Sequence, residues 1–421
     1  MLEPRDRERL SAADASNVLI DAKDQVNVFL LAGILGDGFD LDGLRSHLAA
    51  CLHAPAAGDL RRFSQRPQRL GRGLVWQSCP VDLGWHVRLV DPVVGRDGLA
   101  NLAATLMTVP LPLDRPLWEL LVVPGASPGG HGIILRLHHC VADGVAGVRL
   151  VQRLFADRLA PAVADRHSAT PTTVTRVGLA ARGRWRIRLT SVKRVTALVR
   201  TTVRRTVLLG PIGPRRGVAF VEVDLAELSR GAKSAGATVN DALLAAVCTA
   251  VSTALRAAAE PVPPVLPVSV PVALPERGSS GNAVGMMLVR LPTGEPDAGT
   301  RLRLIASATG TAKTEARAQG TYELTRTRWG TRLFARIVRH QRFIALFVTN
   351  VRGPQQPLVV GGAVLQEAWP VVPIQGNVRL GVAAMSYAGR LGVAVHTDAS
   401  AVNATTAARA LAAELDRIAH G

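Results

Sequence analysis

The chain has 421 residues, of which 48% are hydrophobic, and this is enough to build two or three domains with sizeable cores. Its formal net charge of +18 is high, yet aromatic residues make up only 4% of the chain, which argues against a surface that stacks nucleic-acid bases. We therefore expect a globular protein with no nucleic-acid partner.

The cysteines and the N-terminus bear on the compartment. Four cysteines are spread along the chain without CxxC spacing, at Cys51, Cys79, Cys140 and Cys248. This pattern indicates reduced thiols in a cytosolic protein, and neither a disulfide framework nor a metal site is expected. The charged N-terminus is not followed by an apolar segment of the signal-peptide type. No run of about 18 uncharged apolar residues occurs, so any membrane contact is expected to be peripheral.

The first 160 residues mix helical and strand patterns. Amphipathic helices are predicted from residue 42 and over residues 99–107, and strands over residues 74–76, 86–90 and 120–123. Two prolines bracket a turn before the last of these strands. This half of the chain is predicted to be α+β.

The next predicted strand, over residues 133–137, ends in the pair His138-His139. Alternation along a strand sends the two histidines to opposite faces, so only one of them can point into a given cleft. Imidazole titrates close to neutral pH and can accept a proton from an alcohol or a thiol. Asp143-Gly144 is interpreted as a turn, and a helix is predicted over residues 145–159. Taken alone, the pair indicates two buried structural histidines, because short motifs give many false positives.

Residues 160–175 are rich in Ala, Thr and Pro and are interpreted as a linker. The segment from 171 to 220 then carries twelve basic residues and no acidic one. Within it an apolar stripe recurs at helical spacing, formed by Trp185, Leu189, Val192, Val199 and Val203. A basic amphipathic helix over residues 176–205 suggests an anionic membrane surface as partner. The alternative is a helix docked on the body through its stripe, with solvated arginines outside.

The second half begins with a predicted strand over residues 220–225. Thr238 or Asn240 is expected to cap a long Ala-rich helix over residues 242–259. A basic helical region over residues 301–342 and a final Ala-rich helix are also predicted. The remaining strands are expected over residues 267–272, 286–291, 343–348, 380–386 and 391–398. Two α+β halves joined by a linker and a basic helix are the predicted organisation.

Several short patterns then occur in a characteristic order. They are His138–Gly144 as HHxxxDG, Pro116-Leu117-Trp118, the segment 210–216, Asn240-Asp241, Gly281-Asn282 with Leu291-Pro292, the segment 349–354 and the segment 386–389. With these patterns the chain resembles, over nearly its whole length, the bacterial wax ester synthase/acyl-CoA:diacylglycerol acyltransferase family. That family belongs to the larger CoA-dependent acyltransferase and condensation-domain superfamily.

The resemblance implies an α+β fold of two chloramphenicol-acetyltransferase-like domains with mixed sheets and a tunnel between them. The first domain is expected over residues 1–160 and carries the HHxxxDG segment. Residues 161–216 would form the linker and the basic amphipathic helix, and residues 217–421 the second domain.

The resemblance also implies a reaction, the direct transfer of a fatty acyl group from acyl-CoA to diacylglycerol or a long-chain alcohol. His139 would be the general base that takes the hydroxyl proton and then protonates the leaving thiolate. His138 would support the loop, Asp143 would hold it through hydrogen bonds or an arginine, and Gly144 would leave room for the acyl carbonyl. No cofactor is implied, because acyl-CoA is a substrate, and no GxSxG pattern suggests an acyl-enzyme.

Asn240 is the candidate donor to the tetrahedral oxyanion, since it stands at the positive end of a predicted helix. The alternative is a helix cap with no catalytic part. Asn282 and Asn350 can equally shape turns, and Trp118 is interpreted as a packing residue.

The chain also departs from the family pattern. Arg115 directly precedes Pro116 where two further residues are usual, and the segments 18–21 and 26–28 lack the usual aromatic and Met-His residues. If these segments border the substrate channel, the acceptor could instead be a polyketide or glycolipid hydroxyl. A non-catalytic, membrane-associated lipid-binding protein is a further alternative. The expected location is the cytoplasm, peripheral on the inner face of the membrane or on a lipid droplet.

Overall fold

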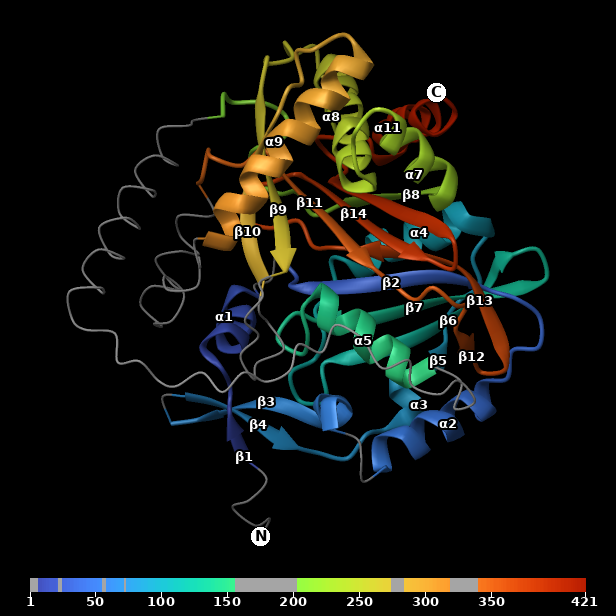
Figure 1. Cartoon of the computed structure of the whole chain (residues 1–421). Coiled ribbons are helices and arrows are strands. Elements are labelled where there is room, and N and C mark those ends of the chain that lie inside the picture. Colours follow the sequence, from blue (N-terminus) through green and yellow to red (C-terminus); the bar gives the residue numbers. More distant parts are fainter. Residues whose placement is uncertain are drawn as a thin grey trace, which may run out of the picture.

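Two six-stranded mixed sheets form the body of the protein (Figure 1). The computed structural model describes residues 7–21, 25–54, 58–71, 73–155, 203–273, 284–318 and 340–421. The first sheet contains, in order, β12 (Val359–Val360), β13 (Ala363–Val371), β2 (Val28–Leu35), β7 (Gly130–His138), β6 (Trp118–Ser127) and β5 (Val87–Leu89). The second contains β10 (Val284–Leu291), β9 (Leu266–Ala273), β11 (Leu346–Arg352), β14 (Leu380–Tyr387), β15 (Arg390–Asp398) and β8 (Arg216–Asp224). The predicted α+β class with mixed sheets is confirmed.

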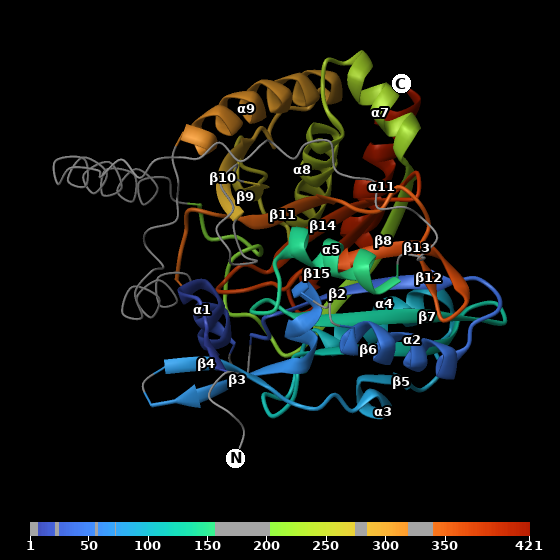
Figure 2. The same ribbon diagram turned by 60° about the horizontal axis from the view of Figure 1, so that its bottom comes forward.

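Helices pack on the faces of both sheets (Figure 2). The first half contributes α1 (Ala12–Ile20), α2 (Leu41–His53), α3 (Leu83–His86), α4 (Gly95–Leu106) and α5 (Gly144–Phe155). The second half contributes α7 (Leu225–Ser234), α8 (Val239–Ala257), α9 (Ala298–Ala318) and α11 (Ala404–His420). The first half also contains a small sheet of β1 (Arg7–Arg9), β4 (Gly73–Ser78) and β3 (Gln65–Leu70). Figure 2 shows α8, α9 and α11 on the side of the second sheet that faces away from the first.

The first sheet includes strands from both halves of the chain. Strand β13 pairs antiparallel with β2, so that Trp369 lies opposite Ala32 and Val371 opposite Leu30. Trp369 stacks on Phe220 of β8 with ring centroids 4.7 Å apart. The two halves of the chain are therefore joined by backbone hydrogen bonds within the first sheet, and the two sheets by side-chain packing. The division into residues 1–160, 161–216 and 217–421 stays a prediction, since residues 156–202 lie outside the described part of the chain.

Helix α8 is the core helix of the second half. Thr238 caps it, because its hydroxyl accepts from the Asp241 amide at 3.3 Å while the Asp241 carboxylate accepts from the Thr238 amide at 2.9 Å. The capping alternative for Asn240 was therefore wrong, since Asn240 lies inside the first turn. By length and composition α8 could span a membrane, but 72% of its most apolar window is buried inside the protein.

The Pro116-Leu117-Trp118 segment is structural. Trp118 is 1% exposed, its indole N–H donates to the Phe63 carbonyl at 2.8 Å, and its ring stacks on His86 at 4.4 Å between centroids. The predicted packing role of Trp118 is confirmed.

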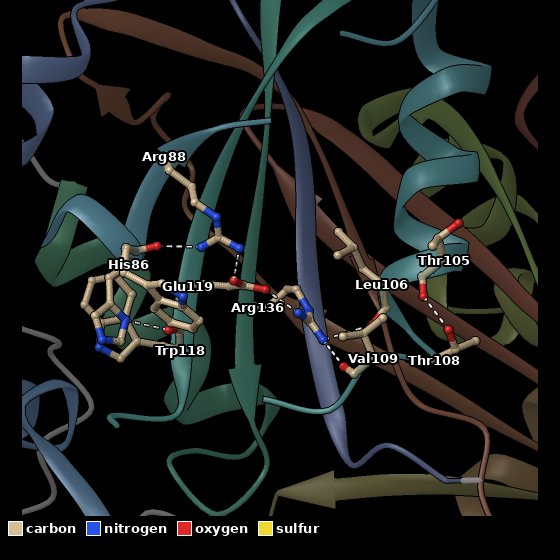
Figure 3. Close-up of polar contacts among 10 residues, drawn as sticks. His86, Arg88, Thr105, Leu106, Thr108, Val109, Trp118, Glu119 and Arg136 are labelled. Atoms are coloured by element: carbon tan, nitrogen blue, oxygen red, sulfur yellow. Dashed lines mark hydrogen bonds and ion pairs between the residues drawn. The ribbon is translucent and has the colours of Figure 1, made fainter. Parts of the chain in front are cut away.

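Beside Trp118, a buried carboxylate lies between two arginines (Figure 3). Glu119 and Arg136 face each other across β6 and β7, and both side chains are at most 3% exposed. The second carboxylate oxygen of Glu119 lies 2.8 Å from Arg88, while Arg136 also donates to the carbonyls of Leu106 and Val109. Glu119 holds Arg136, and Arg136 in turn bonds to carbonyls at the end of α4. This connects the end of α4 to the sheet that carries the histidines.

Candidate active site

The HHxxxDG segment forms the connection from β7 to α5, where the two sheets approach each other. Strand β7 ends at His138 and lies between β2 and β6 in the first sheet. A Cβ added to Gly144 would lie 3.4 Å from Cγ1 of Val351 on β11, so the start of α5 touches the second sheet. In both Figure 1 and Figure 2, α5 lies next to β11 of the second sheet.

The backbone of His139 is held from two sides. Its amide donates to the Asn27 carbonyl at 3.0 Å, and its carbonyl accepts from the Asn17 side chain at 3.1 Å. The imidazole lies against Phe29, with ring centroids 5.1 Å apart. Burial, and to a smaller degree the neighbouring His138, lower the pKa of His139 to about 4. The ring is therefore neutral near neutral pH and can accept a proton.

His138 occupies a different environment, as strand alternation predicts. Its side chain is fully buried, and Nδ1 accepts from the Cys140 amide at 3.0 Å. Because Nδ1 is an acceptor, we assign the ring proton to Nε2. Nε2 lies 3.3 Å from Oδ2 of Asp21, a close electrostatic contact that lacks the alignment of a hydrogen bond. This arrangement supports the turn that carries His139.

Asp143 begins helix α5. Its Oδ1 accepts from the Ala146 amide at 2.8 Å, which is the geometry of a helix N-cap. The prediction of a separate Asp143-Gly144 turn was therefore wrong, because Gly144 is already the first residue of α5. Gly144 does not adopt a left-handed φ, so its backbone conformation does not require glycine. A side chain at this position would approach Val351, and glycine leaves that space open.

The two asparagines proposed for the second half occupy regular structure. Asn240 is half-buried in the first turn of α8, where the helix dipole is positive. Asn350 does not shape a turn; it lies within β11, opposite Ala384 of β14. Gly281-Asn282 and most of the basic segment 176–205 lie outside the described residues, and Val203, the last residue of the apolar stripe, is 5% exposed.

The structure places four residues around His138 and His139 that the sequence had not singled out individually: Asn17, Asp21, Asn27 and Phe29. Asn27 and Phe29 belong to the β2 region, which lies against β7, the strand that ends at His138. Helix α5 packs closely on β2, since a Cβ on Gly147 would come within 2.8 Å of the Phe29 ring. In the part of the chain that the structure describes, no group of His, Cys, Asp and Glu side chains is arranged to hold a metal ion.

The lowered pKa values of three histidines predict how the stability of the protein depends on pH. Burial is the largest cause that lowers the pKa of His86, His139 and His396 from 6.5 to about 4. At pH values above 6.5 neither the folded nor the unfolded chain carries these protons, whereas below 6.5 the unfolded chain binds them first. The free energy of unfolding should therefore fall between pH 6.5 and about 4, by at most about 3 kcal/mol for each histidine.

Urea unfolding at a series of pH values measures this effect. His396→Asn should weaken the pH dependence by the share of one histidine, whereas His53→Gln, which changes an exposed residue, should leave it unchanged. A free energy of unfolding that does not change as the pH falls toward 4 would contradict the assignment.

Comparison with known proteins identifies the family. The profile described as the wax ester synthase/diacylglycerol acyltransferase catalytic domain matches residues 10–205 and 166–243. The profile of the corresponding C-terminal domain matches residues 280–419. A Mycobacterium tuberculosis protein named as a probable diacylglycerol O-acyltransferase is 28% identical over 405 residues, covering 88% of this chain and 86% of its own. A Mycobacterium bovis relative with a similar name has the same identity and coverage.

Solved structures agree on the fold. The wax ester synthase/diacylglycerol acyltransferase of Marinobacter aquaeolei superposes with a TM-score of 0.71 at 20% identity, covering 98% of this chain and 100% of its own. The first condensation domain of the CDA synthetase gives 0.62 at 17% identity, covering 98% and 95%. The two-domain fold that the family resemblance implied is confirmed. From its profile matches along most of its length, the chain belongs to the wax ester synthase/diacylglycerol acyltransferase family.

Proposed function

We propose that this protein transfers a fatty acyl group directly from acyl-CoA to the hydroxyl of a diacylglycerol or a long-chain alcohol, with His139 as the general base. The family profile and the names of the relatives support the reaction and its substrate classes. The observation that carries the role of His139 is its neutral ring at the β7–α5 connection, next to the second sheet.

The reaction needs one group that first accepts and then donates a proton. As the alcohol oxygen attacks the thioester carbon, its proton moves to the neutral ring of His139. The tetrahedral oxyanion then collapses, the C–S bond breaks, and the imidazolium protonates the departing CoA thiolate. A thiol has an ordinary pKa of about 8.5, so an imidazolium with a pKa of about 4 gives up its proton readily. No acyl-enzyme is formed in this sequence.

Asn240 is proposed to donate a hydrogen bond to the oxyanion from the first turn of α8. Asn240→Ala should then lower kcat by roughly 10²- to 10³-fold, the usual effect of removing such a donor. Steady-state kinetics with a long-chain acyl-CoA measures the loss. Thr238→Ala is the matched control, because it weakens the same helix start by about 1 kcal/mol but leaves the amide donor in place. Equal losses of kcat in both variants would refute the donor role.

We also propose that the basic segment places the protein on an anionic membrane surface or lipid droplet, on the cytoplasmic side. The concentration of twelve cationic and no acidic residues between 171 and 220 supports this. A test variant replaces four of these residues with glutamine: Arg182, Arg186, Lys193 and Arg200. The control replaces four exposed arginines elsewhere: Arg69, Arg149, Arg256 and Arg409.

The test variant should bind phosphatidylserine-containing liposomes more weakly at low salt, by up to about 1 kcal/mol for each charge removed. Liposome sedimentation measures this binding. The control should bind nearly as well as the original protein. Equal binding of both variants would mean that the segment is a solvated face.

An acceptor panel tests the substrate class. Thiol release from one acyl-CoA is measured with diacylglycerol, hexadecanol, a polyketide alcohol and a glycolipid. His139-dependent release with the first two acceptors supports the proposed function, and release only with the latter two would assign the acceptor to the other hydroxyl classes. Absence of any His139-dependent release would favour a lipid-binding protein without catalysis.

A further inference from the structure

Asp21 occupies a position that none of the proposed chemical steps uses. It follows α1 as its C-cap residue, and its side chain is 12% exposed. Oδ1 accepts from the Asn27 amide at 3.0 Å, while Oδ2 lies 3.3 Å from Nε2 of His138. One carboxylate therefore faces both segments that surround His139.

Helix stability does not explain a carboxylate at this position. The C-terminal end of a helix carries partial negative charge, so an acidic side chain there is unfavourable by a few tenths of a kcal/mol or more. In α1 no basic residue in the last turn compensates for it. The carboxylate of Asp21 is instead accounted for by its contacts with Asn27 and His138.

The first route from Asp21 runs through His138. A carboxylate beside Nε2 favours the tautomer that carries its proton on that nitrogen. This leaves Nδ1 as the acceptor for the Cys140 amide, at 3.0 Å. In the other tautomer Nδ1–H would face the Cys140 N–H, and two donors would oppose each other. Asp21 thus fixes the turn in which His139 lies between His138 and Cys140.

The second route runs through two asparagines. The Asn27 amide is held by Asp21, and the Asn27 carbonyl accepts from the His139 amide at 3.0 Å. The Asn27 side chain donates to the Asn17 carbonyl at 3.0 Å, and the Asn17 side chain donates to the His139 carbonyl. Both backbone polar groups of His139 are therefore held by the segment that Asp21 organises.

The same segment bonds to the second half of the chain. The Gln375 side chain donates to Oδ1 of Asn27 at 2.5 Å. Gln25 and Gly376 exchange a reciprocal pair of hydrogen bonds, at 2.8 and 3.0 Å. The position of His139 is consequently fixed relative to the loop that follows β13.

We propose that Asp21 is a positioning residue for acyl transfer, which acts through His138 and Asn27 to orient His139. The inference rests on the proposed function of His139 as the general base. Because Asp21 does not touch the reacting atoms, its loss should reduce kcat while the KM for both substrates stays within about twofold.

The test is a double-mutant cycle between Asp21 and His138. Asp21→Asn keeps the size of the side chain and the acceptor for Asn27, but it turns an amide toward Nε2 of His138. Asp21→Asn and His138→Asn should each lower kcat by roughly 10- to 100-fold, as loss of the outer partner does for oriented histidines. The double variant should lose no more than the worse single variant, because both changes interrupt one route.

Further measurements separate positioning from loss of folding. Asp40→Asn is the matched control, since Asp40 accepts the Asp42 amide at the start of α2, and it should keep full activity. Far-ultraviolet circular dichroism and urea unfolding should show Asp21→Asn to be folded. Histidine ring ¹⁵N NMR should show His138 losing its Nε2–H tautomer in Asp21→Asn.

Three outcomes would overturn the inference: unchanged kcat in Asp21→Asn, losses that multiply in the double variant, or a raised KM at constant kcat. His139→Ala distinguishes the two levels of the argument. If that variant remains active, the proposed function fails. If it is inactive while the Asp21 cycle gives any of these three outcomes, only the positioning role fails.

Discussion

Replacing His139 with alanine is expected to lower kcat for acyl transfer by roughly 10²- to 10⁴-fold, the usual contribution of a general base. The ring is the proton acceptor in the proposed step, and burial keeps it neutral. The loss should appear in kcat and kcat/KM equally, because the proton is transferred only in the transition state. Thiol release from a long-chain acyl-CoA with diacylglycerol or hexadecanol measures both constants.

The matched control for this prediction is His53→Ala, which removes an exposed imidazole from the end of α2 and should keep full activity. Urea unfolding should show that His139→Ala is folded. A folded variant with full activity would exclude His139 as the base.

Glu119→Ala is expected to cause the largest loss of stability, about 3–5 kcal/mol in the free energy of unfolding. The change leaves Arg136, which is 2% exposed, without its carboxylate partner. Desolvation already lowers the pKa of this guanidinium, and removal of Glu119 takes away the main group that opposes the effect. Urea unfolding at neutral pH measures the loss.

Glu227→Ala provides the control for an exposed ion pair. Glu227 lies 3.9 Å from Arg230 and 3.5 Å from His420, all three side chains are at least 43% exposed, and its removal should cost no more than about 1 kcal/mol. If Glu119→Ala were as mild as Glu227→Ala, the buried pair would not be what holds α4 against the sheet.

Strand β7, which ends at His138, could be predicted from the sequence, whereas its neighbour β2 could not. Residues 133–137 are apolar except for Arg136 and are followed by two histidines, and this pattern predicts both the strand and the site. Strand β2 is apolar throughout, from Val28 to Leu35, because packing covers both of its faces. Without alternation or flanking turn residues, such a run gives no period from which a strand can be distinguished.

The partners of His139 depend on contacts between distant parts of the chain. The Asn17 side chain donates to the His139 carbonyl, and the two residues are 122 positions apart in sequence. No local sequence pattern predicts such a contact. The segments 18–21 and 26–28 had been expected to border a substrate channel, and the structure places Asp21 and Asn27 beside the turn that carries His139. Asp143-Gly144 shows a smaller difference, because the same residue types suit a turn and a helix start.

The pairing of a strand from the second half with a strand from the first half could not be predicted from the sequence either. Strand β13 belongs to the second half in sequence, but its partner β2 lies near the start of the chain. Periodicity predicts elements and not their pairing, so the expected two α+β halves carried no information on which strands pair across them. The observed pairing explains how the loop after β13 reaches Gln25 and Asn27.

The central claim is that a hydroxyl attacks acyl-CoA directly with His139 as the base. The most direct measurement incubates the protein with radiolabelled acyl-CoA, with and without the acceptor alcohol, and follows free CoA, ester and protein-bound acyl group together. The account predicts that CoA and ester appear in equal amounts only when the acceptor is present, with no acylated protein and no ester from His139→Ala. Acylated protein in the absence of the acceptor, or ester formed by His139→Ala at the original rate, would contradict it.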